Sequence, residues 1–224
     1  MNKPRPDSFG GNRLSAHPQT PPRAVESAAF TFIWKGAGAW VLEFHLGVPP
    51  DLLILPAPAE PTRADELWKH TCCELFLLNP ADGSYLEFNF SPSGRWAAYH
   101  FDAYRQGMRK FEVQRPCIFT SNPVQSAMSL KARFRSYGLD EESVQRLASS
   151  IENLPVAPNF YLRVEFEDPQ LRNDTPWRAG VSAVVEESDG TKSYWALAHP
   201  PGDPDFHDEA GFLLDLPASP DAPV

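Results

Sequence analysis

Apolar and polar residues alternate with a period of two over much of the chain. In the segment WVLEFHLGV, residues 40–48, every second residue is apolar, and Glu43 and His45 stand among the residues between them. Successive side chains of a β-strand point to opposite faces, so this alternation predicts strands with one buried face. The 24 prolines are spread along the chain, which fits many short strands and turns and disfavours a helical protein.

The same pattern recurs in short segments separated by turn sequences. Between residues 67 and 108 we predict three consecutive antiparallel strands, with turns at NPADG, residues 79–83, and SPSG, residues 91–94. Further strands are predicted at 128–134, 159–166, 180–187, 193–199 and 211–216. Many strands at short intervals predict an all-β fold, a β-sandwich of jelly-roll or immunoglobulin-like type.

One segment follows a helical period instead. Residues 139–154 carry apolar side chains at helical spacing, and Asp140 stands where an N-cap is expected. The apolar positions are Val144, Leu147, Ile151 and Leu154. We predict a single helix inserted between strands.

The two ends of the chain differ in composition from its middle. Residues 1–24 are rich in Pro, Arg, Ser and Gly and are typical of a disordered leader, and residues 217–224 are typical of a flexible tail. With 224 residues, 42% of them hydrophobic, the chain can form one substantial core. Residues 25–216 are therefore expected to form a single domain.

Charge and cysteine content limit the partners and the compartment. The formal net charge is −9, which argues against nucleic acid and anionic membrane surfaces as partners. The first residues, MNKPRPDSFGGNR, lack the apolar core of a secretory signal, and no apolar run approaches the length of a membrane span. Cys72, Cys73 and Cys117 are a poor disulfide framework, being odd in number and partly adjacent. We expect a reduced, cytoplasmic protein.

The strands between residues 67 and 108 gather candidate binding residues. Glu74 lies among apolar neighbours in CCELFLL and needs a partner, because an unpaired buried charge is costly. Glu87 and Asn89 share one face of the next strand, and Arg95 begins the strand after it. These groups suit hydrogen bonds to sugar hydroxyls. A structural Glu–Arg salt bridge with an Asn-stabilised turn explains the same residues.

Two tryptophans are candidates for stacking on a ligand. Trp68 follows the charged stretch PTRADE and precedes a strand, while Trp195 lies near the end of a later strand. A flat indole face stacks on the C–H face of a pyranose ring or on a cation. The alternative is that both rings belong to the core or plug its rim.

Other chemistry finds less support in the sequence. The C-terminal segment at 199–212 includes Asp203, Asp205 and Asp208, which are candidates for a calcium site or for capping an ordered turn. Glu74 and Glu87 could mimic a glycosidase pair. The chain shows no nucleophile elbow, and its only glycine pair near a basic residue lies in the expected leader. We predict a protein that is not an enzyme.

Three segments resemble the bacterial DOMON-like proteins, which are related to the family 9 carbohydrate-binding modules. They are ELWKHTCCELFLL, YLEFNFSPSGRWAAYHFDAYRQGM and GVSAVVEESDGTKSYWALAHPPGDPDFH. The resemblance implies a non-catalytic β-sandwich in which two tryptophans grip a sugar end and charged side chains bind its hydroxyls. Trp68 and Glu74 match the family's Trp–x5–Glu pattern, Arg95 its arginine, and Trp195 its second tryptophan. Cys73 departs from the basic residue that such modules often carry.

The resemblance also leaves alternatives open. Other DOMON relatives bind haem b through a Met and a His or similar residue. Here Met108 is the candidate ligand, opposite His100, His199 or His207, whereas Met128 is expected to face the core. A third interpretation is an exposed sheet face that binds another protein or a second copy of the chain. The leading prediction is a non-catalytic module for a saccharide or similar polyol, with no cofactor.

Overall fold

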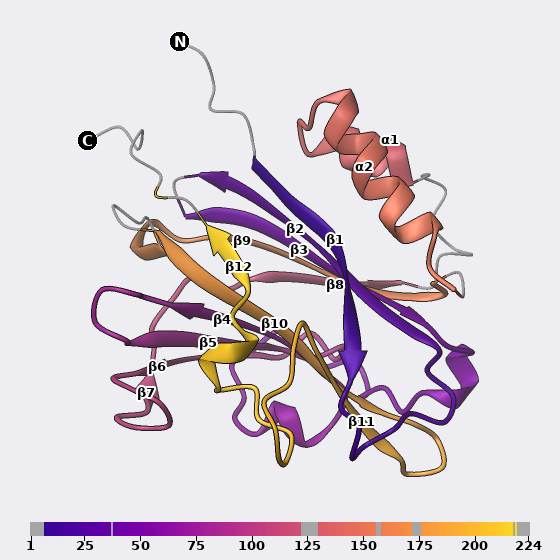
Figure 1. Ribbon diagram of the computed structural model, residues 1–224, viewed down its shortest axis with the longest axis horizontal. Helices are drawn as coiled ribbons and strands as arrows, with labels where there is room; N and C mark the ends of the chain where they lie inside the picture. Colours follow the sequence, from indigo (N-terminus) through magenta and orange to yellow (C-terminus); the bar gives the residue numbers. More distant parts are fainter. Residues whose placement is uncertain are drawn as a thin grey trace.

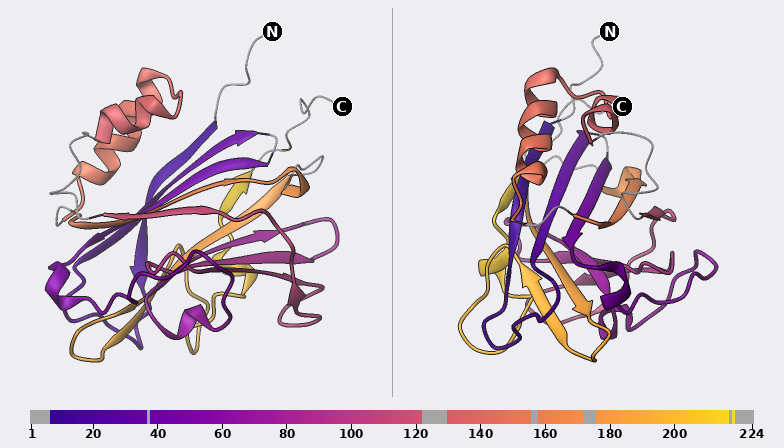
Figure 2. Two further views of the ribbon diagram at one scale, coloured as in Figure 1. Left: turned by 180° about the vertical axis from the view of Figure 1, so that it is seen from behind. Right: turned by 90° about the vertical axis from the view of Figure 1, so that its right-hand side faces the viewer.

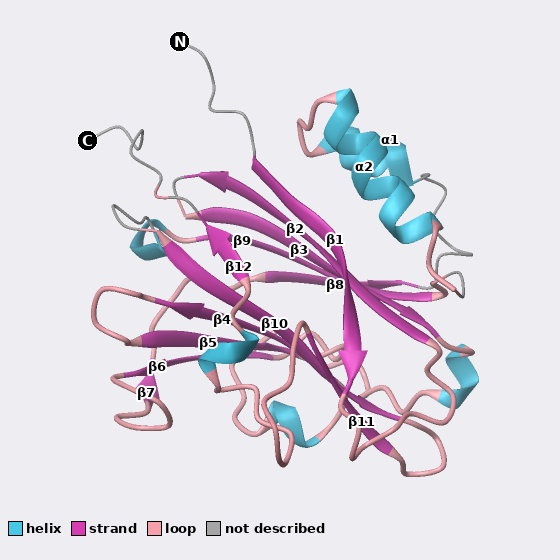
Figure 3. Cartoon of the chain, viewed as in Figure 1, coloured by secondary structure: helices cyan, strands magenta, loops and turns pink. Residues whose placement is uncertain are grey.

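The computed structural model describes residues 7–36, 38–121, 130–155, 158–171, 176–216 and 218. Strands dominate the described part, and two helices lie to one side of them (Figures 1 and 3). The mostly β architecture predicted from the alternation is confirmed. None of the helices described is long and apolar enough to cross a membrane.

Twelve strands form one curled antiparallel sheet. They are β1 Asp7–Ala16, β2 Ser27–Gly36, β3 Ala39–Gly47, β4 Cys72–Leu78, β5 Tyr85–Phe90, β6 Trp96–Phe101, β7 Arg109–Lys110, β8 Cys117–Ser121, β9 Phe160–Glu167, β10 Trp177–Glu186, β11 Lys192–Ala196 and β12 Leu214–Leu216. Their hydrogen-bonded order is β7-β6-β5-β4-β10-β11-β1-β2-β3-β9-β8, and β12 pairs with β10. The helices are α1 Leu130–Ser136 and α2 Glu141–Glu152.

Strand β1 joins the two halves of this sheet. Most of its length pairs with β2, whereas Ser15 and Ala16 pair with β11. The sheet curls at this strand, so that its halves lie as two layers (Figure 2). The disordered leader predicted over residues 1–24 is therefore wrong for residues 7–16, which form β1; residues 1–6 lie outside the described part.

The main core lies between the two halves of the sheet. Every second side chain of the strands points into it, and these side chains are almost fully buried, among them Phe30, Phe32, Phe44, Leu75, Phe88 and Val181. Full burial of a large apolar side chain stabilises the fold by roughly 1.5–3 kcal/mol. The remaining residues of each strand are consequently displayed on the outer faces.

Helices α1 and α2 cover the outer face of β2 and β3 (Figure 2). Asp140 caps α2 by accepting a hydrogen bond from the Ser143 backbone N–H at 2.8 Å. The four apolar positions predicted within 139–154 are all buried, which confirms that helix. The strand predicted at 128–134 is wrong where it is described, because residues 130–134 belong to α1.

Candidate functional site

A pocket of about 360 Å³ opens on the outer face of the other half of the sheet. Glu74 from β4 and Glu87 from β5 line it, together with the aromatic residues Trp68, Phe101, Tyr194 and Phe206. The lining is completed by Arg105, Met108, Val184, Pro204 and His207. The volume lies within the range of small-molecule sites, about 300–1,000 Å³.

Strand register brings the polar side chains of this pocket together. Glu74 lies opposite Asn89 of β5 and Ser182 of β10. Glu87 is two residues from Asn89, so it shares the same face of the sheet. Leu75, which follows Glu74, and Phe88, which lies between Glu87 and Asn89, point the other way and belong to the main core. The period of two thus places both carboxylates on the pocket side.

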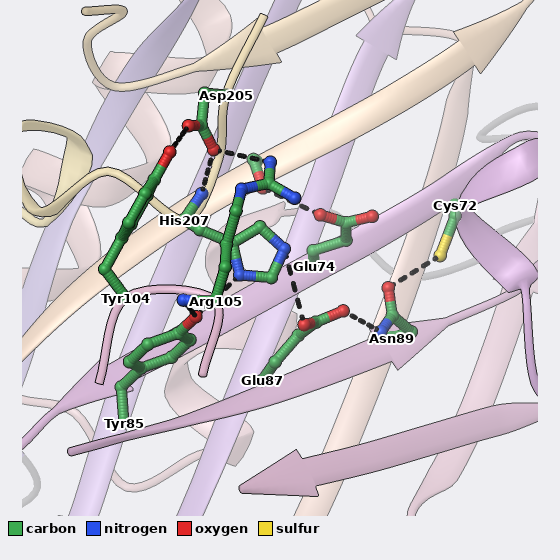
Figure 4. A network of polar contacts seen from close by, with 10 residues as sticks. Cys72, Glu74, Tyr85, Glu87, Asn89, Tyr104, Arg105, Asp205 and His207 are labelled. Atoms are coloured by element: carbon green, nitrogen blue, oxygen red, sulfur yellow. Dashed lines mark hydrogen bonds and ion pairs between the residues drawn. The ribbon is translucent and has the colours of Figure 1, made fainter. Parts of the chain in front are cut away.

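Both carboxylates are deeply buried, with only 3% of Glu74 and 4% of Glu87 exposed. The Ser182 hydroxyl donates to Glu74 Oε2 at 3.3 Å, and the Asn89 amide donates to Glu87 Oε1 at 2.6 Å (Figure 4). Burial, and then the charge of Glu87, raises the pKa of Glu74 well above its usual range. Burial raises the pKa of Glu87 to about 7, although Asn89 and Arg105 partly offset it. At neutral pH the pair therefore carries fewer than two negative charges.

Asn89 holds Glu87 in place from beneath. It is fully buried, and its Oδ1 accepts a weak hydrogen bond from the Cys72 thiol at 3.6 Å. Burial, followed by the charge of Glu74, raises the pKa of the Cys72 thiol, which keeps it protonated as a donor. Asn89 does not line the pocket itself, so it acts as a positioning residue for Glu87.

Arg105 stands at the rim of the pocket, between β6 and β7. Its Nη2 donates to Asp205 Oδ1 at 2.8 Å, and the Tyr104 hydroxyl donates to Asp205 Oδ2 at 2.5 Å (Figure 4). The backbone of Arg105 is left-handed, with φ at 54°. Such a conformation costs about 1 kcal/mol or more in a non-glycine residue. The paired contacts to Asp205 hold the arginine there.

His207 lies between Tyr85 and Glu87. The Tyr85 hydroxyl accepts the Arg105 backbone N–H at 3.1 Å and lies 2.8 Å from His207 Nδ1. We assign its proton to that Nδ1, which leaves the ring proton on Nε2, 3.8 Å from Glu87 Oε2. Burial and then the charge of Arg105 lower the pKa of His207 to about 4. A neutral ring at this distance forms no ion pair with Glu87.

Trp68 and Trp195 do not meet. Trp68 lines the pocket and packs edge-on against Tyr99, with ring centroids 6.2 Å apart. Trp195 is 5% exposed, belongs to the main core, and donates from Nε1 to Ser193 Oγ at 2.9 Å. The predicted clamp of two tryptophans is therefore wrong. The neighbouring Tyr194 points the other way and supplies the second aromatic wall.

Arg95 does not join the carboxylates either. It is exposed and lines a separate pocket of about 530 Å³ together with Ser91, Ser93 and residues 56–59. Arg105, from the loop after the next strand, stands beside the carboxylates instead. The predicted salt bridge between Glu74 and Arg95 is absent among the described contacts.

Two of the three calcium candidates, Asp205 and Asp208, have other contacts, and Asp203 is exposed. Asp205 binds Arg105 and Tyr104, and Asp208 caps a short 3-10 turn by accepting the Ala210 backbone N–H at 2.8 Å. Within the described residues, no three His, Cys, Asp or Glu side chains gather as a metal site would require. The contacts of Asp205 and Asp208 correspond to the ordered-turn interpretation.

The haem candidates are spread over the molecule. Met108 and His207 line the same pocket, whereas His199 packs edge-on against His17 with ring centroids 4.8 Å apart. His100 lies near Asp102, with 3.7 Å between Nδ1 and Oδ1. Met128 falls outside the described residues.

Sequence reasoning missed Tyr194, Phe206 and Arg105 as pocket residues. Tyr194 is adjacent to Trp195, and only the register of β11 against β10 decides which of the two faces the core. Phe206 and Arg105 come from loops that carry no periodic signal. His207 stands in the segment at 199–212, which also carries the calcium candidates, and the sequence indicated it as a possible haem ligand.

Comparisons with known proteins bear on the fold of the chain. No family model matches the chain, and no curated protein matches it. Among solved structures it is similar to a "putative carbohydrate-binding protein" from Bacteroides uniformis, with a TM-score of 0.56 and 12% identity over 92% of this chain and 84% of that one. At such low identity the likeness concerns the fold, so the resemblance to DOMON-like proteins and family 9 modules stays a prediction.

Proposed function

We propose that this protein binds a saccharide or a related polyol without converting it. The observation that carries the proposal is one pocket that combines aromatic walls with two buried carboxyl groups. Trp68 and Tyr194 offer ring faces to the C–H surface of a sugar. Glu74 and Glu87 offer hydrogen bonds to its hydroxyls.

The state of the carboxyl groups suits hydroxyl ligands. A hydroxyl both donates and accepts a hydrogen bond, and a carboxyl pair that retains part of a proton can do the same. The described contacts give Glu74 one partner, Ser182 on Oε2. A ligand hydroxyl could donate a hydrogen bond to the other carboxyl oxygen, Oε1.

Similarity of fold to a solved structure is a second observation that supports the proposal. The similar structure from Bacteroides uniformis carries a carbohydrate-binding description, and it matches this chain over most of its length. The proposal also includes a sandwich of jelly-roll or immunoglobulin-like type and a cytoplasmic location. It further includes a single domain, whose first strand is β1 rather than a strand after residue 24. The pocket-binding role is the part that experiment reaches first.

Titration calorimetry against a panel of neutral mono- and disaccharides tests this function. We expect Trp68→Ala and Tyr194→Ala each to weaken binding by about tenfold, since a stacked aromatic ring contributes roughly 0.5–1.5 kcal/mol in addition to the apolar surface that it buries. Phe119→Ala is the matched control, because Phe119 is 43% exposed on β8, outside the residues that line the pocket. Binding by Trp68→Ala at the wild-type level would remove this pocket from the proposal.

A further inference from the structure

The pocket has an unusual balance of charge. Of the described residues that line it, Glu74 and Glu87 are acidic, and Arg105 and His207 are the ones that could carry positive charge. The Arg105 guanidinium is held by Asp205 at 2.8 Å, so its charge is already matched. His207 is partly buried, and its Nδ1 accepts a hydrogen bond from the Tyr85 hydroxyl, so the ring is neutral. The lining thus supplies no unmatched cation to the carboxyl pair.

The unmatched acceptors point into the pocket. Glu74 Oε1 has no partner among the described contacts, and Glu87 Oε2 has His207 Nε2 at 3.8 Å, beyond hydrogen-bonding distance. The two side chains come from adjacent strands and lie diagonally across the β4–β5 pairing (Figure 4). A small cationic group placed between them could donate hydrogen bonds to both.

A neutral hydroxyl supplies hydrogen bonds here but no charge. An ammonium group supplies three donors and a positive charge, and an adjacent positive charge favours the ionised form of the two buried carboxyl groups. Hydrogen bonds to charged groups are about twice as strong as neutral ones. The ring faces of Trp68, Tyr194 and Phe206 in the same lining are also attractive to a cation.

We infer that the ligand is an amino sugar with a free, protonated amine, whose ammonium group lies between Glu74 and Glu87 while its ring lies against Trp68 and Tyr194. The inference rests on the proposed function and narrows its ligand class. Acetylation of the amine removes the charge and two of the three donors, so an N-acetylated sugar loses the advantage.

Calorimetric titration of the full chain at pH 7 with glucosamine, glucose and N-acetylglucosamine tests the inference. We expect glucosamine to bind at least about tenfold more tightly than either neutral sugar, as one charge-assisted contact provides. Glu87→Gln is expected to reduce that preference to less than about threefold, because a neutral amide weakens the binding of the charged glucosamine more than the binding of glucose. Asp102→Asn is the matched control, because Asp102 is an exposed carboxylate outside the pocket lining, and it should leave the preference unchanged.

The remaining outcomes separate the two proposals. Glucose binding as tight as glucosamine binding overturns the amine inference and leaves saccharide binding in place. Ethanolamine binding as tight as glucosamine, with neither neutral sugar bound, overturns the role of the sugar ring and with it both proposals. Absence of binding by all of these compounds also overturns both. If Glu87→Gln does not fold by circular dichroism, the wild-type preference for glucosamine over glucose still decides the inference.

Discussion

Two groups of buried carboxyl side chains lie on the two halves of the sheet, and their pKa values are shifted in opposite directions. Glu43 of β3 is fully buried beneath the helices, while Glu74 and Glu87 are buried at the pocket. All three interrupt strands whose other residues are mostly apolar. They differ in what the rest of the chain brings to them.

Glu43 is met by groups that satisfy its charge. Arg133 Nε from α1 lies 3.0 Å from Oε1, the Tyr137 hydroxyl donates to Oε1 at 2.5 Å, and His45 Nε2 lies 3.4 Å from Oε2. Burial on its own would raise the pKa of Glu43, but the contacts with His45, Arg133 and Tyr137 outweigh it and lower the pKa. This carboxylate is ionised and fastens the helices to the sheet.

Glu74 and Glu87 receive hydrogen bonds from a serine hydroxyl and an amide, while the nearby Arg105 is paired with Asp205, and the pKa of each carboxyl group is raised. Burial alone therefore does not distinguish a structural carboxylate from one that meets a ligand. The difference lies in the partners: an arginine of the fold pairs with Glu43, whereas under the proposed function a ligand would pair with Glu74 and Glu87. Three predictions test this contrast, in order of decreasing effect.

The largest effect is expected at Glu43. Glu43→Gln leaves the Arg133 guanidinium buried without its counter-charge, and removing one partner of a buried ion pair typically costs about 3–5 kcal/mol. Urea unfolding at pH 7 measures this loss. The double variant Glu43→Gln with Arg133→Met should recover much of the lost stability, because the unpaired guanidinium charge is then removed as well. A loss below about 1 kcal/mol in the single variant would mean that the ion pair does not anchor the helices.

At Glu87, in contrast, we expect the substitution by glutamine to increase the stability of the fold. The pKa of Glu87 rises from 4.5 to about 7 on folding, so the folded state binds the proton more tightly, and stability falls as pH rises through this window. At about 1.4 kcal/mol per pKa unit, the loss approaches 3 kcal/mol at pH 8. Glu87→Gln should be more stable than wild type at pH 8 and similar to it near pH 4.5.

Unfolding curves of both proteins across pH 4.5–8 measure this difference. Parallel curves, without divergence above pH 7, would show that Glu87 is ionised at no cost in the folded protein. The gain in stability should accompany the loss of amine preference described above, which marks a site that sacrifices stability for binding.

A smaller effect on the acid side is expected at His207. Its pKa falls from 6.5 to about 4 on folding, so the folded state binds the proton more weakly. Stability is then present above pH 6.5 and lost as pH falls toward 4, by about 2 kcal/mol once partial exposure is allowed for. His207→Gln should flatten unfolding curves between pH 6.5 and 4. If the variant lost stability between pH 6.5 and 4 as steeply as the wild type, that loss would come from groups other than His207.

Several elements follow from the sequence alone because their signals are local. The predicted strand CCELFLL corresponds to β4, Cys72–Leu78. Gly83 of the predicted Asp-Gly turn has a φ of 77°, which suits glycine. Asp140 caps α2 as its position indicates. In each case the residues that decide the structure are neighbours in the chain.

Other elements were missed because distant pairing decides them. The glycine-containing segment DSFGGNRLSA shows no clear alternation, yet it forms β1 by pairing with β2 and β11. In residues 130–134, Leu130, Ala132 and Phe134 alternate as in a strand. Phe134 instead packs with Ile33 and Val41 on the outer face of the sheet, within α1. Short apolar patterns do not separate helix from strand, and the surface available for packing makes the choice.

The candidate site divides in the same way. The sequence by itself determined that Glu74 is a carboxylate in an apolar strand, and that Glu87 and Asn89 share a face two residues apart. Only the tertiary structure decided that Ser182, 108 residues away, would be the partner of Glu74. It also decided that Tyr194 rather than Trp195 would face the pocket, and Arg105 rather than Arg95 would stand beside it. Alternation fixes which residues share a face, but the pairing of distant strands fixes which face is buried and which loops close over it.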